Sequence, residues 1–137
     1  MVLFVLVAAL TAVLYPGTEA GPDREADEFL EILISAPTDT ARLRRVAHIS
    51  DADDPRALLQ GLSTGVALNF LQARQAQGIG LATKIVDRQH PSSEHYNVTV
   101  RISDTNASEA VSSSYFVVQL QQTGTGEWRI VSVKTAD

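Results

Sequence analysis

The hydrophobic residues follow two different rhythms along the chain, and the change lies near Gln77. Between residues 23 and 74 they recur every three or four positions, which is the period of an amphipathic helix. From Gly78 onward they alternate with polar residues, which is the period of a strand with one buried face. The pattern therefore predicts helices in the first half of the chain and strands in the second.

Two helices are predicted before residue 50. The first covers about residues 23–35, because acidic residues fill its first turn and Pro37 stops it. The second is short, begins after Thr38 or Thr40 as a capping residue, and ends near Ser50. Both place apolar residues on one face only, so both are expected to pack against a common core.

The third predicted helix is the longest. It begins at the Asp54-Pro55 pair, a favourable helix start, and continues to about Arg74. It includes Gly61 and Gly65, each of which costs about 1 kcal/mol relative to alanine in a helix. A close approach of another backbone is therefore expected at these glycines. Its apolar stripe comprises Leu58, Leu59, Leu62, Val66, Phe70 and Leu71.

Four strands are predicted after Gly78, separated by short polar turns at residues 91–94, 104–107 and 123–126. Short turns between consecutive strands produce an antiparallel meander. The predicted fold class is therefore α+β, with three N-terminal helices packed on one face of a curved four-stranded antiparallel sheet.

Composition narrows the class of protein. The chain has 137 residues, 45% of them hydrophobic, and no cysteine. This length supports one domain, expected over residues 21–137, and the absence of cysteine excludes disulfides and thiolate metal sites. The formal net charge is −5 and basic residues are not clustered, so a nucleic-acid partner is not expected.

The first 14 residues carry no charge, and all of them except one threonine are apolar. Tyr15-Pro16-Gly17 follows them. A run of this length is typical of a signal peptide, with cleavage before Gly21. No lysine or arginine precedes the run, so a membrane anchor stays open beside a cleaved signal, and a buried core helix is a third interpretation. Residues 1–20 are therefore expected to be the only membrane contact, and the domain is expected to be periplasmic or extracellular.

The third predicted strand has apolar residues on both of its faces at Tyr115-Phe116-Val117-Val118. One face meets the helices, so the other needs a second cover. We expect Phe116 and Val118 to form an interface with a second copy or another protein. The alternative is that this strand end tucks under the C-terminal residues.

The order of elements and the last strand, Gly126-Glu127-Trp128-Arg129-Ile130-Val131-Ser132-Val133, resemble the nuclear transport factor 2-like (cystatin-like cone) superfamily, in particular its small bacterial extracytoplasmic members. The resemblance implies a cone-shaped cavity between sheet and helices and frequent dimerisation through the sheet. It implies no reaction, because this scaffold hosts many. The residues expected to line the cone and to bind a small apolar ligand are Phe29, Leu33, Phe70, Ile85, Tyr115 and Trp128.

Candidate chemistry is sparse. Asp87 continues the apolar face of its strand, and with Tyr115 as a hydrogen-bond donor it could form an acid–base pair. The acidic cluster at residues 48–54 does not match the sequence pattern of an EF-hand calcium-binding loop. We interpret it as residues that end one helix and begin the next, with Asp54 as a helix cap. His90 and His95 are expected to lie opposite each other at an exposed turn. No metal and no cofactor is expected.

The sequence therefore favours a non-enzymatic extracytoplasmic binding domain, which takes either a small apolar ligand or a protein partner. Two alternatives stay open. One is a membrane-anchored subunit of a secretion- or conjugation-type envelope assembly. The other is an isomerase- or dehydratase-like enzyme that uses Asp87 and Tyr115.

Overall fold

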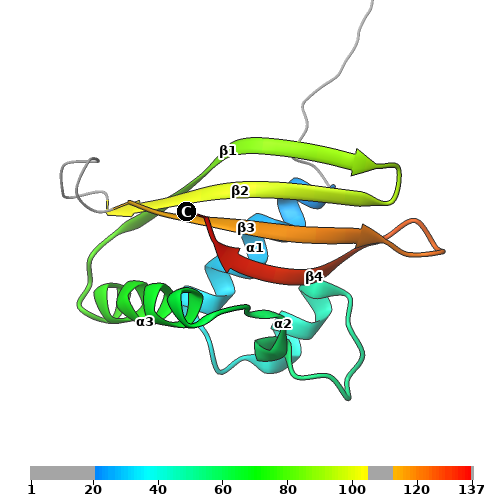
Figure 1. Cartoon of the computed structure of the whole chain (residues 1–137). Coiled ribbons are helices and arrows are strands. Elements are labelled where there is room, and N and C mark those ends of the chain that lie inside the picture. The colour runs from blue at the N-terminus through cyan, green and yellow to red at the C-terminus, as the bar shows by residue number, and fades with distance from the viewer. Residues whose placement is uncertain (1–20, 105–112, 137) are drawn as a thin grey trace, which may run out of the picture.

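The computed structural model describes residues 21–104 and 113–136. The predicted fold class is confirmed: three helices precede four antiparallel strands, and the helices pack against the sheet (Figure 1). The elements are α1 (Pro22–Ser35), α2 (Thr40–Ala47), a 3₁₀ turn η2 (Pro55–Leu58), α3 (Leu62–Ala76), β1 (Leu81–Ser92), β2 (His95–Asp104), β3 (Ser113–Gln122) and β4 (Trp128–Thr135).

The first two helices match their predicted positions closely. Pro22 occupies the first turn of α1, and Ala36 follows its last residue. The cap of α2 is Asp39, whose carboxylate accepts a hydrogen bond from the Arg42 amide, and not either threonine. His48 ends α2 in the left-handed conformation, with φ of 58°. Pro22 in the first turn thus favours the start of α1, which has no side-chain cap, and a capping carboxylate sets the start of α2 at a residue other than the predicted threonines.

The predicted third helix is interrupted. Asp54 caps as expected, since its carboxylate accepts from the Arg56 amide, but the segment it starts is only the 3₁₀ turn η2. Gly61 has φ of 86° and precedes α3, where its left-handed conformation breaks the helical path. The close backbone approach expected at the glycines is wrong, because a Cβ at Gly61 or Gly65 would meet nothing within 4 Å.

This break rotates the face that α3 buries. Thr64, Leu68 and Leu71 point into the core, whereas Leu62 and Phe70 are 91% and 51% exposed. The predicted position of Phe70 in the cone is therefore wrong. The apolar stripe that was expected to be buried as a whole is split, because the helix restarts at Leu62 and does not continue from Pro55.

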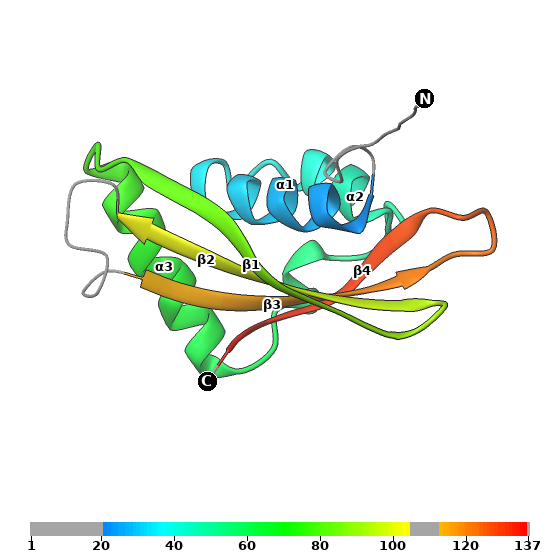
Figure 2. The same ribbon diagram turned by 90° about the horizontal axis from the view of Figure 1, so that it is seen from above.

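The sheet has the order β1-β2-β3-β4, and every neighbouring pair is antiparallel. In β1, register shifts fall between Ile85 and Asp87 and between Gln89 and Ser92. A third falls between Gln119 and Leu120 in β3, where Val131 of β4 has no pairing partner in the register. Bulges of this kind bend strands and increase their twist. The curvature is visible in Figure 2, where the strands cross one another along their length.

The two faces of the sheet differ in composition. The core face carries Val98, Val100, Ile102, Phe116, Val118, Leu120, Ile130 and Val133, all buried with Phe29, Leu30 and Leu33 of α1. The other face, called the outer face below, carries Thr99, Arg101, Tyr115, Val117 and Gln119. Phe116 and Val118 are 0% exposed, so their predicted place on an exposed interface is wrong.

Contacts at the margins of the sheet tie it to the helical layer. Leu59 forms a parallel bridge with Val133, which covers the free edge of β4. The Arg74 guanidinium on α3 pairs with buried Asp104 on β2. The Arg88 guanidinium on β1 pairs with Asp23 on α1 at 2.6 Å, and this hydrogen bond raises the pKa of Arg88. These links fix α1 and α3 against the sheet.

The predicted signal peptide or anchor at residues 1–20 lies outside the described residues. Among the helices of residues 21–104 and 113–136, none combines the length and the apolar character that a bilayer crossing requires.

Candidate functional site

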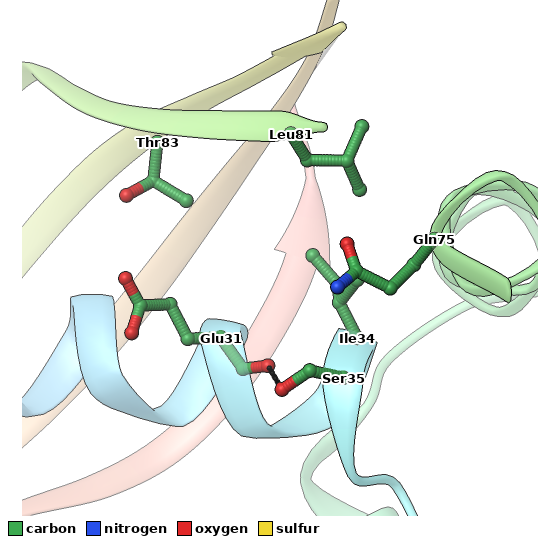
Figure 3. Close-up of a pocket in the computed structure, with 6 residues that line it drawn as sticks. All are labelled: Glu31, Ile34, Ser35, Gln75, Leu81 and Thr83. Atoms are coloured by element: carbon green, nitrogen blue, oxygen red, sulfur yellow. Dashed lines mark hydrogen bonds between the residues drawn. The ribbon is translucent and has the colours of Figure 1, made fainter. Parts of the chain in front are cut away.

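A pocket of about 240 Å³ lies where α1, α3 and β1 diverge at one end of the molecule. Six residues line it: Glu31, Ile34 and Ser35 of α1, Gln75 of α3, and Leu81 and Thr83 of β1. In Figure 3 the Glu31 carboxylate points from α1 toward Thr83, and the Gln75 amide reaches from α3 toward Ile34. We call this the α1/α3/β1 pocket.

Local structure explains why the pocket forms there. Gly78 has φ of 84° after the end of α3, and its left-handed conformation turns the chain back toward α1. The Ile79 amide donates to the Arg74 carbonyl, which closes this turn at 3.1 Å. Leu81 therefore begins β1 directly beside the last turns of α1 and α3.

Hydrogen bonds fix two walls of the pocket. The Thr83 hydroxyl donates to the Asp27 carboxylate on α1 at 2.6 Å, which joins β1 to α1. The Ser35 hydroxyl donates to the Glu31 backbone carbonyl at 2.7 Å, one helical turn earlier (Figure 3). Each hydroxyl has a single proton and two lone pairs. Both protons are used within the fold, so these two oxygens can only accept from a ligand.

The Glu31 carboxyl group sits in an unfavourable environment for charge. Burial raises its pKa, and the nearby carboxylates of Asp27 and Glu28 raise it further, while the Arg42 guanidinium lowers it. The residue is nevertheless accessible from solvent at the mouth of the pocket. A carboxyl group with a raised pKa in a cleft is a physically motivated candidate for function.

The predicted cone-lining residues do not surround this pocket. Phe29 and Leu33 are packed in a core that side chains fill, and Ile85 is partly buried against that core. Leu33 also lines a second pocket of about 230 Å³, between α1 and α3. Trp128 lies in an aromatic cluster with Tyr96 and His90, at centroid distances of 5.7 and 6.1 Å.

The predicted acid–base pair is also displaced. Asp87 pairs with Thr99 and Tyr115 with Arg101, so both residues lie on the outer face. The cause is the bulge at Val86, which shifts β1 by one position and moves Asp87 away from the apolar face of Ile85. The expectation that Asp87 and Tyr115 face a cavity is therefore wrong, and Tyr115 is 41% exposed.

The histidines have partners other than those expected. His95 pairs with Ser92 and its Nδ1 is 2.7 Å from the Ser92 hydroxyl, so His90 and His95 do not face each other. His48 lies 3.2 Å from Glu25 and 3.8 Å from Glu127, which connects α1 to the β3–β4 turn. Burial is the main cause that raises the pKa of Glu25. Within the described ranges, no three histidine, aspartate or glutamate side chains are grouped so that they could hold a metal ion.

Sequence reasoning missed every residue of the α1/α3/β1 pocket. Glu31 belongs to the acidic side of α1, where charged residues usually contact solvent. Thr83 and Leu81 belong to an ordinary alternating strand pattern, and Gln75 lies just beyond the predicted end of the third helix at about Arg74. The usable signal was the short connection from Gln77 to Gly80, which requires β1 to begin next to the end of α3.

The chain is similar in overall structure to several solved structures, among them the following two. One is a ketosteroid isomerase-like protein from Erwinia carotovora atroseptica SCRI1043, with 13% identity, a TM-score of 0.48, and coverage of 88% of this chain and 96% of the other. The second is a de novo β-sheet design, with 18% identity, a TM-score of 0.41, and coverage of 82% and 84%. Neither the family models nor the curated protein sequences that were searched match the chain.

Proposed function

We propose that this chain is a non-enzymatic binding domain that acts outside the cytoplasm and holds a small molecule in the α1/α3/β1 pocket. The observation that carries the proposal is the pocket itself, which is partly enclosed and lined by both apolar and polar side chains. Small-molecule sites commonly have this composition. The interior between the helices and the sheet is occupied by buried side chains, so the ligand enters at the end of the cone and not its centre.

The compartment and the family are parts of the same proposal. The apolar segment at residues 1–14 supports export, and the order of three helices and four curved strands supports membership of the nuclear transport factor 2-like superfamily. Sequencing the N-terminus of the mature protein separates the two forms of export. A start at Gly21 indicates a secreted domain, whereas a retained apolar segment indicates an anchored subunit of an envelope assembly.

An enzymatic role has less support from the pocket. Proton abstraction next to a carbonyl needs a base together with a hydrogen-bond donor for the developing oxyanion. Glu31 could serve as a base, but the Thr83 and Ser35 hydroxyl protons are already used. Among the six lining side chains, all of them described, Gln75 alone offers a donor without a recorded acceptor. Binding without chemistry fits this inventory better.

A protein partner on the outer face remains the second candidate. Tyr115, Val131 and Val86 are exposed large side chains on or beside this face. The Nε atom of Arg101 is buried there and has no hydrogen-bond partner within the described residues. A covering surface would exclude water from the apolar residues and could satisfy this donor. The expected interface thus moves from Phe116 and Val118 to the residues around Tyr115.

A fragment screen observed by amide NMR tests the main proposal. We expect a subset of small molecules to shift the amide signals of Ile34, Leu81 and Thr83. Leu81→Trp fills the pocket and should abolish these shifts. Leu62→Trp adds the same ring at an exposed site on α3 and should leave them unchanged. Hits that shift none of the pocket signals, or that persist in Leu81→Trp, would contradict the proposal.

A further inference from the structure

We infer that the α1/α3/β1 pocket takes a small organic cation, namely a primary ammonium group on a short apolar chain. The inference rests on the proposed function, since it names the class of ligand for the same pocket. Three properties of the lining lead to it: the hydrogen-bonding groups that remain available, the local charge, and the apolar surface beside them.

The hydrogen-bonding groups that remain available are mostly acceptors. The Thr83 hydroxyl donates its hydrogen bond to Asp27, and the Ser35 hydroxyl donates its hydrogen bond to the Glu31 carbonyl. Both oxygens can therefore only accept hydrogen bonds from a ligand. No hydrogen bond or ion pair reaches the Glu31 carboxylate from any residue that the structure describes. An ammonium group has three N–H donors and no acceptor, and therefore complements this set.

The local charge has the matching sign. Glu31 lines the pocket, and Asp27 lies directly behind Thr83. Glu28 adds a third carboxylate close enough to disfavour ionisation of Glu31, while Arg42 is the opposing cation. Arg74, at the α3 side, is paired with Asp104 and does not neutralise the pocket. A bound cation would relieve the repulsion among the carboxylates, whereas a bound anion would increase it.

The apolar part of the lining sets the rest of the ligand. Ile34 and Leu81 form a hydrophobic wall next to the polar groups, as Figure 3 shows. A volume of about 240 Å³ corresponds to roughly eight water molecules at ~30 Å³ each. A chain of a few methylene groups fits this space, with its ammonium end at Glu31 and its carbons on Ile34 and Leu81.

Titration of the full-length protein with three probes of equal length tests the inference. The probes are n-pentylamine, 1-pentanol and pentanoate, followed by amide NMR at neutral pH. We expect pentylamine to bind in the pocket about tenfold more tightly than pentanol, because hydrogen bonds to a charged group are the stronger ones. Pentanoate should not bind there.

Two variants assign the preference to one carboxylate. Glu31→Gln keeps the shape of the side chain and removes its charge, so pentylamine and pentanol should then bind equally. Glu94→Gln removes the same charge from the exposed β1–β2 turn, outside the pocket lining and its neighbouring carboxylates, and the preference for pentylamine should persist. Equal binding of pentylamine and pentanol to the unmodified protein would overturn the inference and leave the proposed function intact. Failure of all three probes to shift the pocket signals would contradict both.

Discussion

The Thr83 hydroxyl on β1 donates a hydrogen bond of 2.6 Å to the Asp27 carboxylate on α1, 56 residues earlier in the chain. This bond joins the sheet to the first helix at the rim of the α1/α3/β1 pocket. It also consumes the hydroxyl proton of Thr83, so the same contact shapes the pocket and determines that this wall accepts hydrogen bonds.

Replacing Thr83 by valine, which has nearly the same shape, tests the structural part of this relationship. We expect the free energy of unfolding to fall by about 1–2 kcal/mol, because a partly buried carboxylate loses a donor. Urea unfolding measures the change. Thr99→Val, on the outer face, is the matched control and should stay within about 0.5 kcal/mol of the unmodified protein. Equal effects of the two substitutions would show that the bond to Asp27 does not stabilise the fold.

The two glycines near the start of α3 should respond to alanine in opposite directions. Gly61→Ala forces a side chain into a positive φ of 86° and should cost about 1 kcal/mol. Gly65→Ala lies within the helix, where the added methyl group meets nothing within 4 Å, and should stabilise by about 0.5–1 kcal/mol. Thermal unfolding of both variants checks the pair. Destabilisation by Gly65→Ala would indicate that another chain approaches this helix.

Glu31 should make stability depend on pH. Burial and the neighbouring carboxylates raise its pKa above the ordinary value of 4.5, so the folded protein favours the protonated form. This contribution to stability is complete below pH 4.5 and is lost as the pH rises through the folded-state pKa. Glu31→Gln should therefore melt at a higher temperature than the unmodified protein at neutral pH, and at a similar temperature under acidic conditions.

Melting curves across the acidic to neutral range measure the difference, with Glu94→Gln in the exposed β1–β2 turn as the control. The control should follow the unmodified protein at every pH. A gap between Glu31→Gln and the unmodified protein that widens as the pH falls would have the opposite sign and would refute the assignment.

Self-association through the outer face is the next expectation. Light scattering after size-exclusion chromatography should show a dimer at micromolar concentration, and Tyr115→Lys should convert it to a monomer because it places a charge at the centre of the contact. Leu62→Lys, at an exposed position on α3, should leave the dimer intact. A monomeric unmodified protein would remove the support for this interface.

The arrangement of elements was predictable because hydrophobic periodicity is a local property. The change of rhythm at Gln77 separated the helices from the strands, and short polar turns required neighbouring strands to pair. Capping residues and prolines set the ends of α1 and α2 within a few residues. Each of these signals is contained in a short window of sequence, and tertiary contacts did not override them.

Which side chains of each strand face the core was less predictable. A single extra residue reverses every side chain that follows it, and the bulge at Val86 moved Asp87 to the outer face in this way. In β3, apolar residues occur on both faces, so the pattern could not decide whether Tyr115 or Phe116 is buried. The register with β2 decides it, because Phe116 pairs with Val100 on the core face.

The pocket was not predictable because no single segment contains it. Glu31, Gln75 and Thr83 come from three elements, and only the tertiary fold brings them together. In the sequence, Glu31 is one of several acids on an amphipathic helix, and a solvated position is the ordinary expectation for it. The hydrogen bond between Thr83 and Asp27 holds β1 beside α1, and Thr83 therefore lines the same pocket as the exposed Glu31.

The most direct test of the account is to locate a bound ligand by intermolecular NOEs between n-pentylamine and the methyl groups of the protein. We predict NOEs from the pentylamine methylene protons to the methyl groups of Ile34 and Leu81, with none to Leu62 or Val66 on the exposed side of α3. NOEs to Leu62 and Val66 in place of Ile34 and Leu81 would show that the amine binds a surface patch, and would contradict the claim that the α1/α3/β1 pocket is the binding site.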